Sequence, residues 1–163
     1  MKSGRKSIIG MTLIEVLVYL AIFGLFFTVI INFFFFLQDN NERSGETLKI
    51  DRAVIFLTQH FDDSFEKATS ASGSTVYNNT NGELYLLGST NVNYKLVTSK
   101  IQFNDGVIDK QLTRGDLQVT KFLLEEIKDN SDTVIGVEIT VGIRSIADSS
   151  VSKEFTNSYI FNQ

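Results

Sequence analysis

The chain of 163 residues contains no cysteine, no proline and no tryptophan. Without cysteine it can form no disulfide, no thiolate metal site and no cysteine nucleophile. Without proline, a long helix lacks the residue that most often kinks or breaks it. Charge is also missing from one long stretch, because Glu15 is the one charged residue between Ser7 and Gln38. The chain is thus an apolar N-terminal segment followed by a polar body.

Positive charge is concentrated at the very start of the chain. The first ten residues hold Lys2, Arg5 and Lys6 and no acid, and removing them would take the net charge from −4 to −7. Phosphate binding needs clustered lysine and arginine, which the rest of the chain does not show. We therefore expect no direct nucleic-acid partner.

The apolar run over residues 11–37 is long enough to cross a membrane. As a helix it would be about 40 Å long at about 1.5 Å per residue, against a hydrocarbon core of about 30 Å. Cations before the run and acids from Asp39 onward predict a cytoplasmic N-terminus and a body outside. Four phenylalanines at 33–36 occupy positions where a signal peptidase needs small residues, so cleavage after the run is not expected. Hydropathy alone favours an uncleaved signal anchor of a single-pass cytoplasmic-membrane (inner-membrane) protein.

The junction between leader and apolar run adds a motif. A short basic leader ends in Gly10 and is followed by Met11, Thr12 and Leu13, with Glu15 five residues after the glycine. This junction resembles the N-terminus of the type IV prepilin family, which comprises pilins and the pseudopilins of type II secretion and competence systems. The family has a glycine, usually a phenylalanine, and then Thr-Leu-x-Glu. Only Met11 departs from that pattern.

The resemblance implies processing of the N-terminus. A prepilin peptidase would cut between Gly10 and Met11 on the cytoplasmic face, remove residues 1–10 as a leader peptide, and N-methylate the new amine of Met11. A glycine before the bond lets the protease approach the backbone closely. Methionine in place of the usual phenylalanine at position 11 would affect the efficiency of methylation more than cleavage.

The resemblance also gives Glu15 a role. In a filament its carboxylate would pair with the Met11 amine of a neighbouring subunit and set the axial register, because an unpaired buried charge is strongly unfavourable. The alternative is a structural glutamate that reaches the headgroups from one end of the run. That position limits a cost of about 2.5–3.5 kcal/mol for a carboxylate at mid-depth.

The partners implied by the resemblance are the prepilin peptidase, other pilin or pseudopilin subunits through the N-terminal helix, an assembly platform protein, and membrane lipid before assembly. Ala21 and Gly24 would let neighbouring helices approach closely. No cofactor and no metal site is expected.

Residues 38–70 are predicted to continue the helix after an interruption in the polar stretch 38–46, which contains Gly45. Apolar residues then recur at spacings of four, three, four, four and three, the period of one helix face. They are Ile50, Val54, Leu57, Phe61, Phe65 and Ala68. We expect this amphipathic helix segment to end near residues 70–73.

Residues 71–163 change to short alternating segments. Turn signals at 81–82 and 104–106 separate candidate strands, and residues 137–144 alternate strictly between apolar and other side chains, which predicts one buried and one wet face. The candidate strands are residues 74–77, 83–87, 93–97, 100–103, 106–111, 117–124, 134–144 and 155–161.

The expected fold class is therefore α+β. A long N-terminal helix, with a protruding membrane half over 11–37 and an amphipathic second half, packs on an antiparallel β-sheet head. The resemblance implies the same pilin-like architecture. Segments 94–124 and 134–144 look like minor, J-type pseudopilins or related minor pilins, with another minor type or a small major pilin as the alternative. The helix proline common in major pilins and the C-terminal cysteine pair are absent.

Candidate catalytic and metal-binding residues in the head are few. His60, Asp63 and Ser64 have the residue types of a catalytic triad, but they share one short helix segment, whereas a triad needs side chains from separate elements. A solvated or half-buried helix histidine is the preferred interpretation. Asp129 and Asp132 could bind calcium, but their spacing is not that of a calcium loop, so we expect a polar turn.

Two functions from different classes follow. The first is a structural, non-enzymatic subunit, minor or at the tip, of a type IV pilus or of a type II secretion or competence pseudopilus. The second is a signal-anchored extracytoplasmic receptor or enzyme domain that does not polymerise. Secretion, DNA uptake, adhesion and motility share this N-terminus, so the sequence does not choose among these machines.

Overall fold

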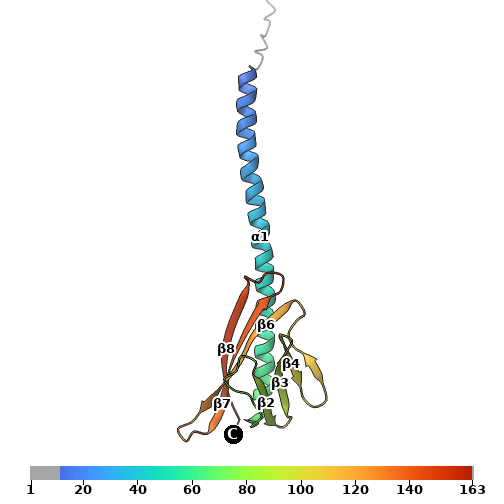
Figure 1. Ribbon diagram of the computed structural model, residues 1–163, viewed down its shortest axis with the longest axis vertical. Helices are drawn as coiled ribbons and strands as arrows, with labels where there is room; N and C mark the ends of the chain where they lie inside the picture. The colour runs from blue at the N-terminus through green and yellow to red at the C-terminus, as the bar shows by residue number, and fades with distance from the viewer. Residues whose placement is uncertain (1–11, 163) are drawn as a thin grey trace, which may run out of the picture. The chain divides into compact units, whose positions relative to one another are not determined.

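A single long helix and eight strands make up the computed structural model, which describes residues 12–162 (Figure 1). The helix, α1, runs from Leu13 to Phe65. The strands are β1 (Ala68–Ala71), β2 (Glu83–Gly88), β3 (Val92–Val97), β4 (Lys100–Asn104), β5 (Asp109–Gln111), β6 (Leu117–Lys128), β7 (Val134–Ser145) and β8 (Ser152–Ile160). The expected α+β class, with a long apolar N-terminal helix and antiparallel strands, is confirmed. The chain divides into two units, Met1–Glu42 and Arg43–Gln163.

The helix shows no interruption at residues 38–46, so that prediction was wrong. Asn40 Nδ2 donates to the Phe36 carbonyl at 3.0 Å, and Thr47 Oγ1 donates to the Arg43 carbonyl at 3.0 Å, so polar side chains here bond to the turn before them. Gly45 costs only about 1 kcal/mol relative to alanine inside a helix. One glycine without a proline is too weak to break α1.

The end of α1 lies earlier than predicted, at Phe65 rather than near residues 70–73. The backbone N–H of Lys67 donates to the Ser64 carbonyl oxygen at 3.3 Å, and β1 begins one residue later, at Ala68. Ala68 then pairs with Gly88, and Ala71 pairs with Leu86. This pairing involves residues far along the chain, so the small residues at 69–74 could not reveal it.

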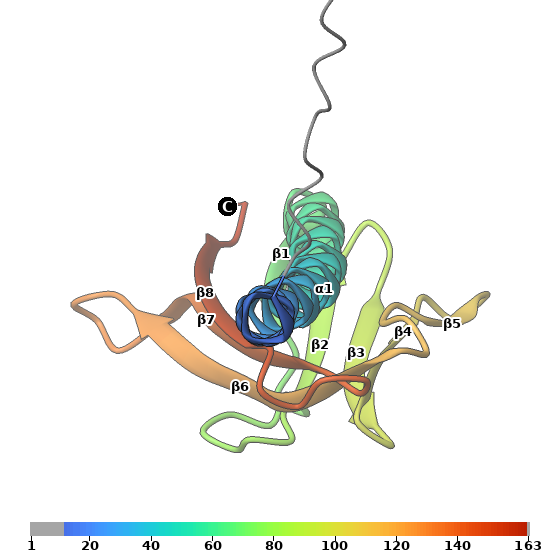
Figure 2. The same cartoon turned by 90° about the horizontal axis from the view of Figure 1, so that it is seen from above.

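The head contains two antiparallel sheets instead of the single sheet predicted. The first sheet has the order β1-β2-β3-β4-β5, and the second has the order β6-β7-β8. In Figure 2 the two sheets spread to opposite sides beneath the second half of α1. A parallel bridge between Asn81 and Phe122, and a hydrogen bond of 2.9 Å from Val119 N to Ser99 O, join the sheets at their seam.

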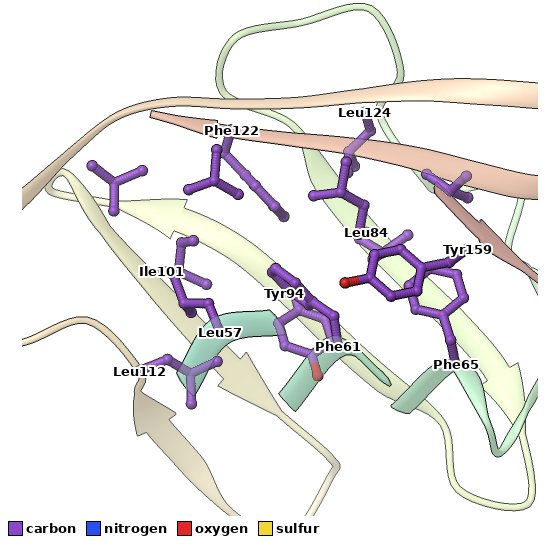
Figure 3. Close-up of a cluster of buried hydrophobic side chains, with 14 of the residues drawn as sticks. Leu57, Phe61, Phe65, Leu84, Tyr94, Ile101, Leu112, Phe122, Leu124 and Tyr159 are labelled. Atoms are coloured by element: carbon purple, nitrogen blue, oxygen red, sulfur yellow. The ribbon is translucent and has the colours of Figure 1, made fainter. Parts of the chain in front are cut away.

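The core forms where α1 meets both sheets. The buried residues of α1 are Ile50, Ala53, Leu57, Phe61 and Phe65. The Phe61 ring centroid lies 5.0 Å from that of Tyr94 on β3, 6.3 Å from Phe122 on β6 and 6.2 Å from Tyr159 on β8 (Figure 3). The predicted apolar stripe is thus the contact face of the helix, except that Val54 is only partly buried and Ala68 belongs to β1.

The strand predicted at residues 74–77 does not form, and the one predicted at 106–111 is shorter than expected, because side chains replace ladder bonds. In residues 74–77 only Val76 makes a bridge, to Glu83, while the Thr75 hydroxyl bonds both the N–H and the C=O of Tyr85. In 106–111 the Asp105 carboxylate accepts from the N–H groups of Val107 and Ile108 at 2.9 and 2.7 Å, so β5 starts only at residue 109.

The strict alternation of residues 137–144 gives a buried face, but the opposite face is not wholly wet. Val137, Ile139, Val141 and Ile143 are buried as predicted. Thr140 is also buried, with its hydroxyl 2.8 Å from that of Thr156. The reason is that β7 is the central strand of its sheet, between β6 and β8.

Candidate functional site

The first candidate site is the apolar half of α1. Its most apolar window of 18 residues has a mean hydropathy of 2.6, and none of that window is buried against the rest of the chain. By length and composition the helix is a candidate membrane span. This is consistent with a single-pass membrane protein.

Glu15 lies in the first turn of this helix. The Thr12 carbonyl accepts from Glu15 N at 3.0 Å and from Val16 N at 3.2 Å, so Thr12 is the N-cap and Glu15 the third helical residue. A carboxylate is stabilised there by the partial positive charge of the helix start. Thr-x-x-Glu is also the spacing of a capping box, a local signal that the sequence interpretation above did not use. The Tyr19 hydroxyl donates to Glu15 Oε1 at 3.4 Å.

The other residues of the predicted processing site lie outside the described residues. These are Lys2, Arg5, Lys6, Gly10 and Met11. The cleavage and methylation predictions therefore stay predictions, and Thr12, Leu13 and Glu15 are the members of the motif within the described residues.

The surface of α1 around its small residues is open. A Cβ built at Gly24 would meet no atom of the chain within 4 Å, and Thr28 Oγ1 donates to the Gly24 carbonyl at 2.9 Å. Ala21 lies three residues earlier on the same side of the helix and is also exposed. Another helix could approach closely here.

The second candidate site surrounds the single histidine in the head. Tyr94 of β3 is fully buried, and its hydroxyl lies 2.7 Å from His60 Nδ1 and 2.6 Å from Ser64 Oγ. The same hydroxyl donates to the His60 carbonyl at 3.2 Å. Burial lowers the pKa of His60 and raises the pKa of Tyr94. A cavity of about 270 Å³ opens beside this cluster.

The predicted half-buried helix histidine is what the structure has. His60 and Ser64 each contact Tyr94, so a tyrosine hydroxyl lies where a triad would need a direct bond between them. The Phe103 ring packs against the imidazole at a centroid distance of 4.6 Å. No sequence signal indicated Tyr94, because its approach to α1 depends on the pairing of β3 with β2 and β4.

The acidic pair at residues 129–132 forms the β6–β7 turn. Asp129 Oδ1 accepts from Ser131 N at 2.8 Å and from Thr133 N at 2.9 Å, and Asp132 has φ of 62°. Lys128 Nζ lies 3.2 Å from Asp132 Oδ1. Within residues 12–162 no group of three or more His, Cys, Asp or Glu could hold a metal ion.

No protein-family model, no curated protein and no solved structure matches this chain.

Proposed function

We propose that this chain is a filament subunit of a type IV pilus or of a type II secretion or competence pseudopilus. Residues 11–37 hold it in the cytoplasmic membrane with the head outside, and prepilin peptidase removes residues 1–10. The subunit then passes into a filament whose core is made of such helices. The observation that carries this proposal is the single carboxylate, Glu15, at the third position of α1, in a segment over residues 13–37 that is otherwise uncharged, apolar and exposed.

The exposed apolar side chains of α1 need a partner in both states of such a subunit. Almost every large side chain between Leu13 and Leu37 is exposed, far more apolar surface than a soluble monomer tolerates. Lipid covers it before assembly, and the helices of neighbouring subunits cover it in the filament. The open surface at Ala21 and Gly24 supports close helix packing.

Burying the charge of Glu15 costs free energy when the helix leaves the membrane and enters a core of packed helices. An unpaired carboxylate there would be strongly unfavourable, whereas pairing with the Met11 amine of a neighbour offsets that cost. Because the pair forms at one axial position only, it sets the register between subunits. Other pilin subunits, the peptidase and the assembly platform are the partners of this function.

The minor or tip role is a finer proposal within this function. It is supported by the order of elements in the head, where the short hairpins of β1 to β5 precede the long pair β6 and β7 of 12 residues each. This arrangement agrees with the J-type resemblance.

The capping geometry of Glu15 favours a second candidate, a signal-anchored extracytoplasmic domain that does not polymerise. In that protein Glu15 would only stabilise the start of α1, for which a carboxylate at the third helical position is sufficient.

The experiment compares Glu15→Gln with Glu15→Ala in cells that process the chain. Glutamine also serves in a capping box, so Glu15→Gln keeps the local role and removes the charge. The proposal predicts that both variants insert in the membrane and lose the leader but are missing from the sheared filament fraction. Wild-type levels of Glu15→Gln in filaments would overturn the pairing role, and absence of the wild-type chain from filaments would support the second candidate.

A further inference from the structure

Two of the four sheet edges in the head are covered by the rest of the chain. Along β6, Phe122 N donates to Thr80 O at 2.8 Å, and Asn78 N donates to Leu124 O at 2.8 Å. At β1, Asn162 N donates to Ala68 O at 3.2 Å. These bonds close the two edges nearest the seam between the sheets.

The other two edges, β5 and β8, are open. Each is the last strand of its sheet, and within residues 12–162 no backbone hydrogen bond reaches the outer side of either. Figures 1 and 2 place β8 and the β4–β5 hairpin on opposite sides of the second half of α1. An open edge is a template for pairing with another chain, and β8 offers nine residues without a proline.

The β8 edge is accompanied by a row of exposed side chains on α1, which we call the α1 row: Leu48, Ile55 and Asp62. Members seven residues apart lie nearly in line, about 10.5 Å from one another along the helix. Leu48 and Ile55 are 57% and 58% exposed, and Asp62 is exposed and has no salt bridge among the described residues.

Two contacts place the α1 row beside β8. Lys153 Nζ lies 2.6 Å from Asp51 Oδ1, and Asn157 Nδ2 donates to Thr58 Oγ1 at 3.4 Å. Asp51 and Thr58 stand four residues before and three residues after Ile55, so they are its neighbours on the helix surface. The row therefore lies beside β8.

The β5 edge carries the complementary set. In the turn of the β4–β5 hairpin, Val107 is 91% exposed and Ile108 is 52% exposed, and Lys110 on β5 is exposed without a salt bridge in the described part of the chain. The turn is held by the Asp105 carboxylate, whose bonds to two backbone N–H groups also lower the pKa of Asp105. A preorganised apolar turn loses little entropy on docking.

We propose that the β4–β5 hairpin of one copy docks on the β8 edge and the α1 row of the next copy of this chain. Val107 and Ile108 cover Leu48 and Ile55, Lys110 pairs with Asp62, and the β5 backbone extends the second sheet. This contact rests on the proposed function, because the filament brings copies of the head side by side.

A second copy is the occupant that the charges and edges favour. Each side offers an open backbone edge, two exposed branched apolar side chains and one charge without a salt bridge among the described residues, and the two charges, Asp62 and Lys110, have opposite signs. Because the two surfaces lie on opposite sides of the head, the contact is head-to-tail and can repeat without closing, as a filament requires. The contact needs two adjacent copies of this chain, which a minor subunit present in more than one copy also supplies.

The test uses the absence of cysteine in the full-length chain, so that introduced cysteines are the only ones. Chains with Ile55→Cys and chains with Val107→Cys are co-expressed, and the sheared filaments are treated with a mild oxidant. A disulfide-linked dimer is expected from the mixture and from neither variant alone. The matched control mixes Val107→Cys with Ser131→Cys, an exposed position in the β6–β7 turn, and should give no dimer.

A charge exchange tests the same contact by a second route. Lys110→Glu and Asp62→Lys should each lower the yield of the disulfide-linked dimer by about two- to fivefold, and the two together should restore it. Filaments that form without the expected dimer, or in which Val107→Cys links to itself, would overturn the contact and leave the proposed function standing. A wild-type chain that keeps its leader and forms no filaments would overturn both.

Discussion

Removing one hydroxyl group, in Tyr94→Phe, should destabilise the head by an amount that its hydrogen bonds set. The ring would keep its place, with centroid distances of 5.0 Å to Phe61 and 5.3 Å to Phe103. What is lost is the hydroxyl that His60 Nδ1 and Ser64 Oγ contact at 2.7 and 2.6 Å.

The magnitude follows from the loss of this hydroxyl as a partner of His60, at its Nδ1 and its carbonyl oxygen, and of Ser64 Oγ. A buried polar group that loses its partner costs about 1–3 kcal/mol, and both groups here are only partly buried, so we expect about 2 kcal/mol in total. Unfolding entropy is about 2.1 cal/mol/K per residue, or about 0.25 kcal/mol/K for a head of roughly 120 residues. The midpoint of thermal unfolding should therefore fall by about 8 °C.

The assay is thermal unfolding of the full-length chain in detergent, followed by the near-ultraviolet circular dichroism of its tyrosines. The matched control is Tyr85→Phe, since the Tyr85 hydroxyl donates to Glu83 Oε2 at 2.9 Å on a partly exposed strand and should cost at most about 0.5 kcal/mol. Equal midpoints for the two variants would refute the reasoning, because the buried hydroxyl would then contribute no more than an exposed one.

Three further predictions concern the head. Burial lowers the pKa of His60 below its ordinary value of 6.5, so the unfolded chain binds more protons, and the free energy of unfolding should fall as the pH drops through about 6.5. Denaturant titrations between pH 5 and pH 8 check this, and His60→Gln should lack that part of the slope. Gly136→Ala should destabilise the head by at least about 2 kcal/mol, because the new Cβ would lie 2.2 Å from the Tyr159 carbonyl oxygen, whereas Gly73→Ala meets no atom within 4 Å and should be nearly neutral in the same titration. Lys100→Met removes an ammonium that donates to the carbonyls of Arg114, Gly115 and Leu117, so the free energy of unfolding should fall by about 1.5–3 kcal/mol in the same titration. Lys95→Met breaks no salt bridge among the described residues and should leave the free energy of unfolding unchanged.

Periodicity predicted the elements whose side chains point to one core. The structure contains the predicted helix stripe with Ile50, Leu57 and Phe61. It also contains six of the predicted strands, with ends shifted by a few residues: β2, β3, β4, β6, β7 and β8. In these segments the order of apolar and polar residues along the chain follows their burial, so a local pattern is enough to predict the element. Thr140, buried on the supposedly wet face of β7, shows the limit of that rule.

The features that the sequence did not reveal depend on contacts between residues far apart in the chain. The strand Ala68–Ala71 exists because Gly88 and Leu86 lie beside it, and the division into two sheets is set by the seam at Phe122. The contact of Tyr94 with His60 likewise joins residues 34 apart. At the N-terminus the reverse holds, since the capping role of Glu15 is local and could have been predicted from Thr12.

The most direct test of the proposed function is to determine at which residue the mature chain begins. The protein is isolated from membranes of cells with and without an active prepilin peptidase, and its intact mass and N-terminal sequence are determined. The filament proposal predicts a chain that begins at Met11, with one added methyl group, only in the cells that have the peptidase. A chain that still carries residues 1–10 in those cells would contradict it.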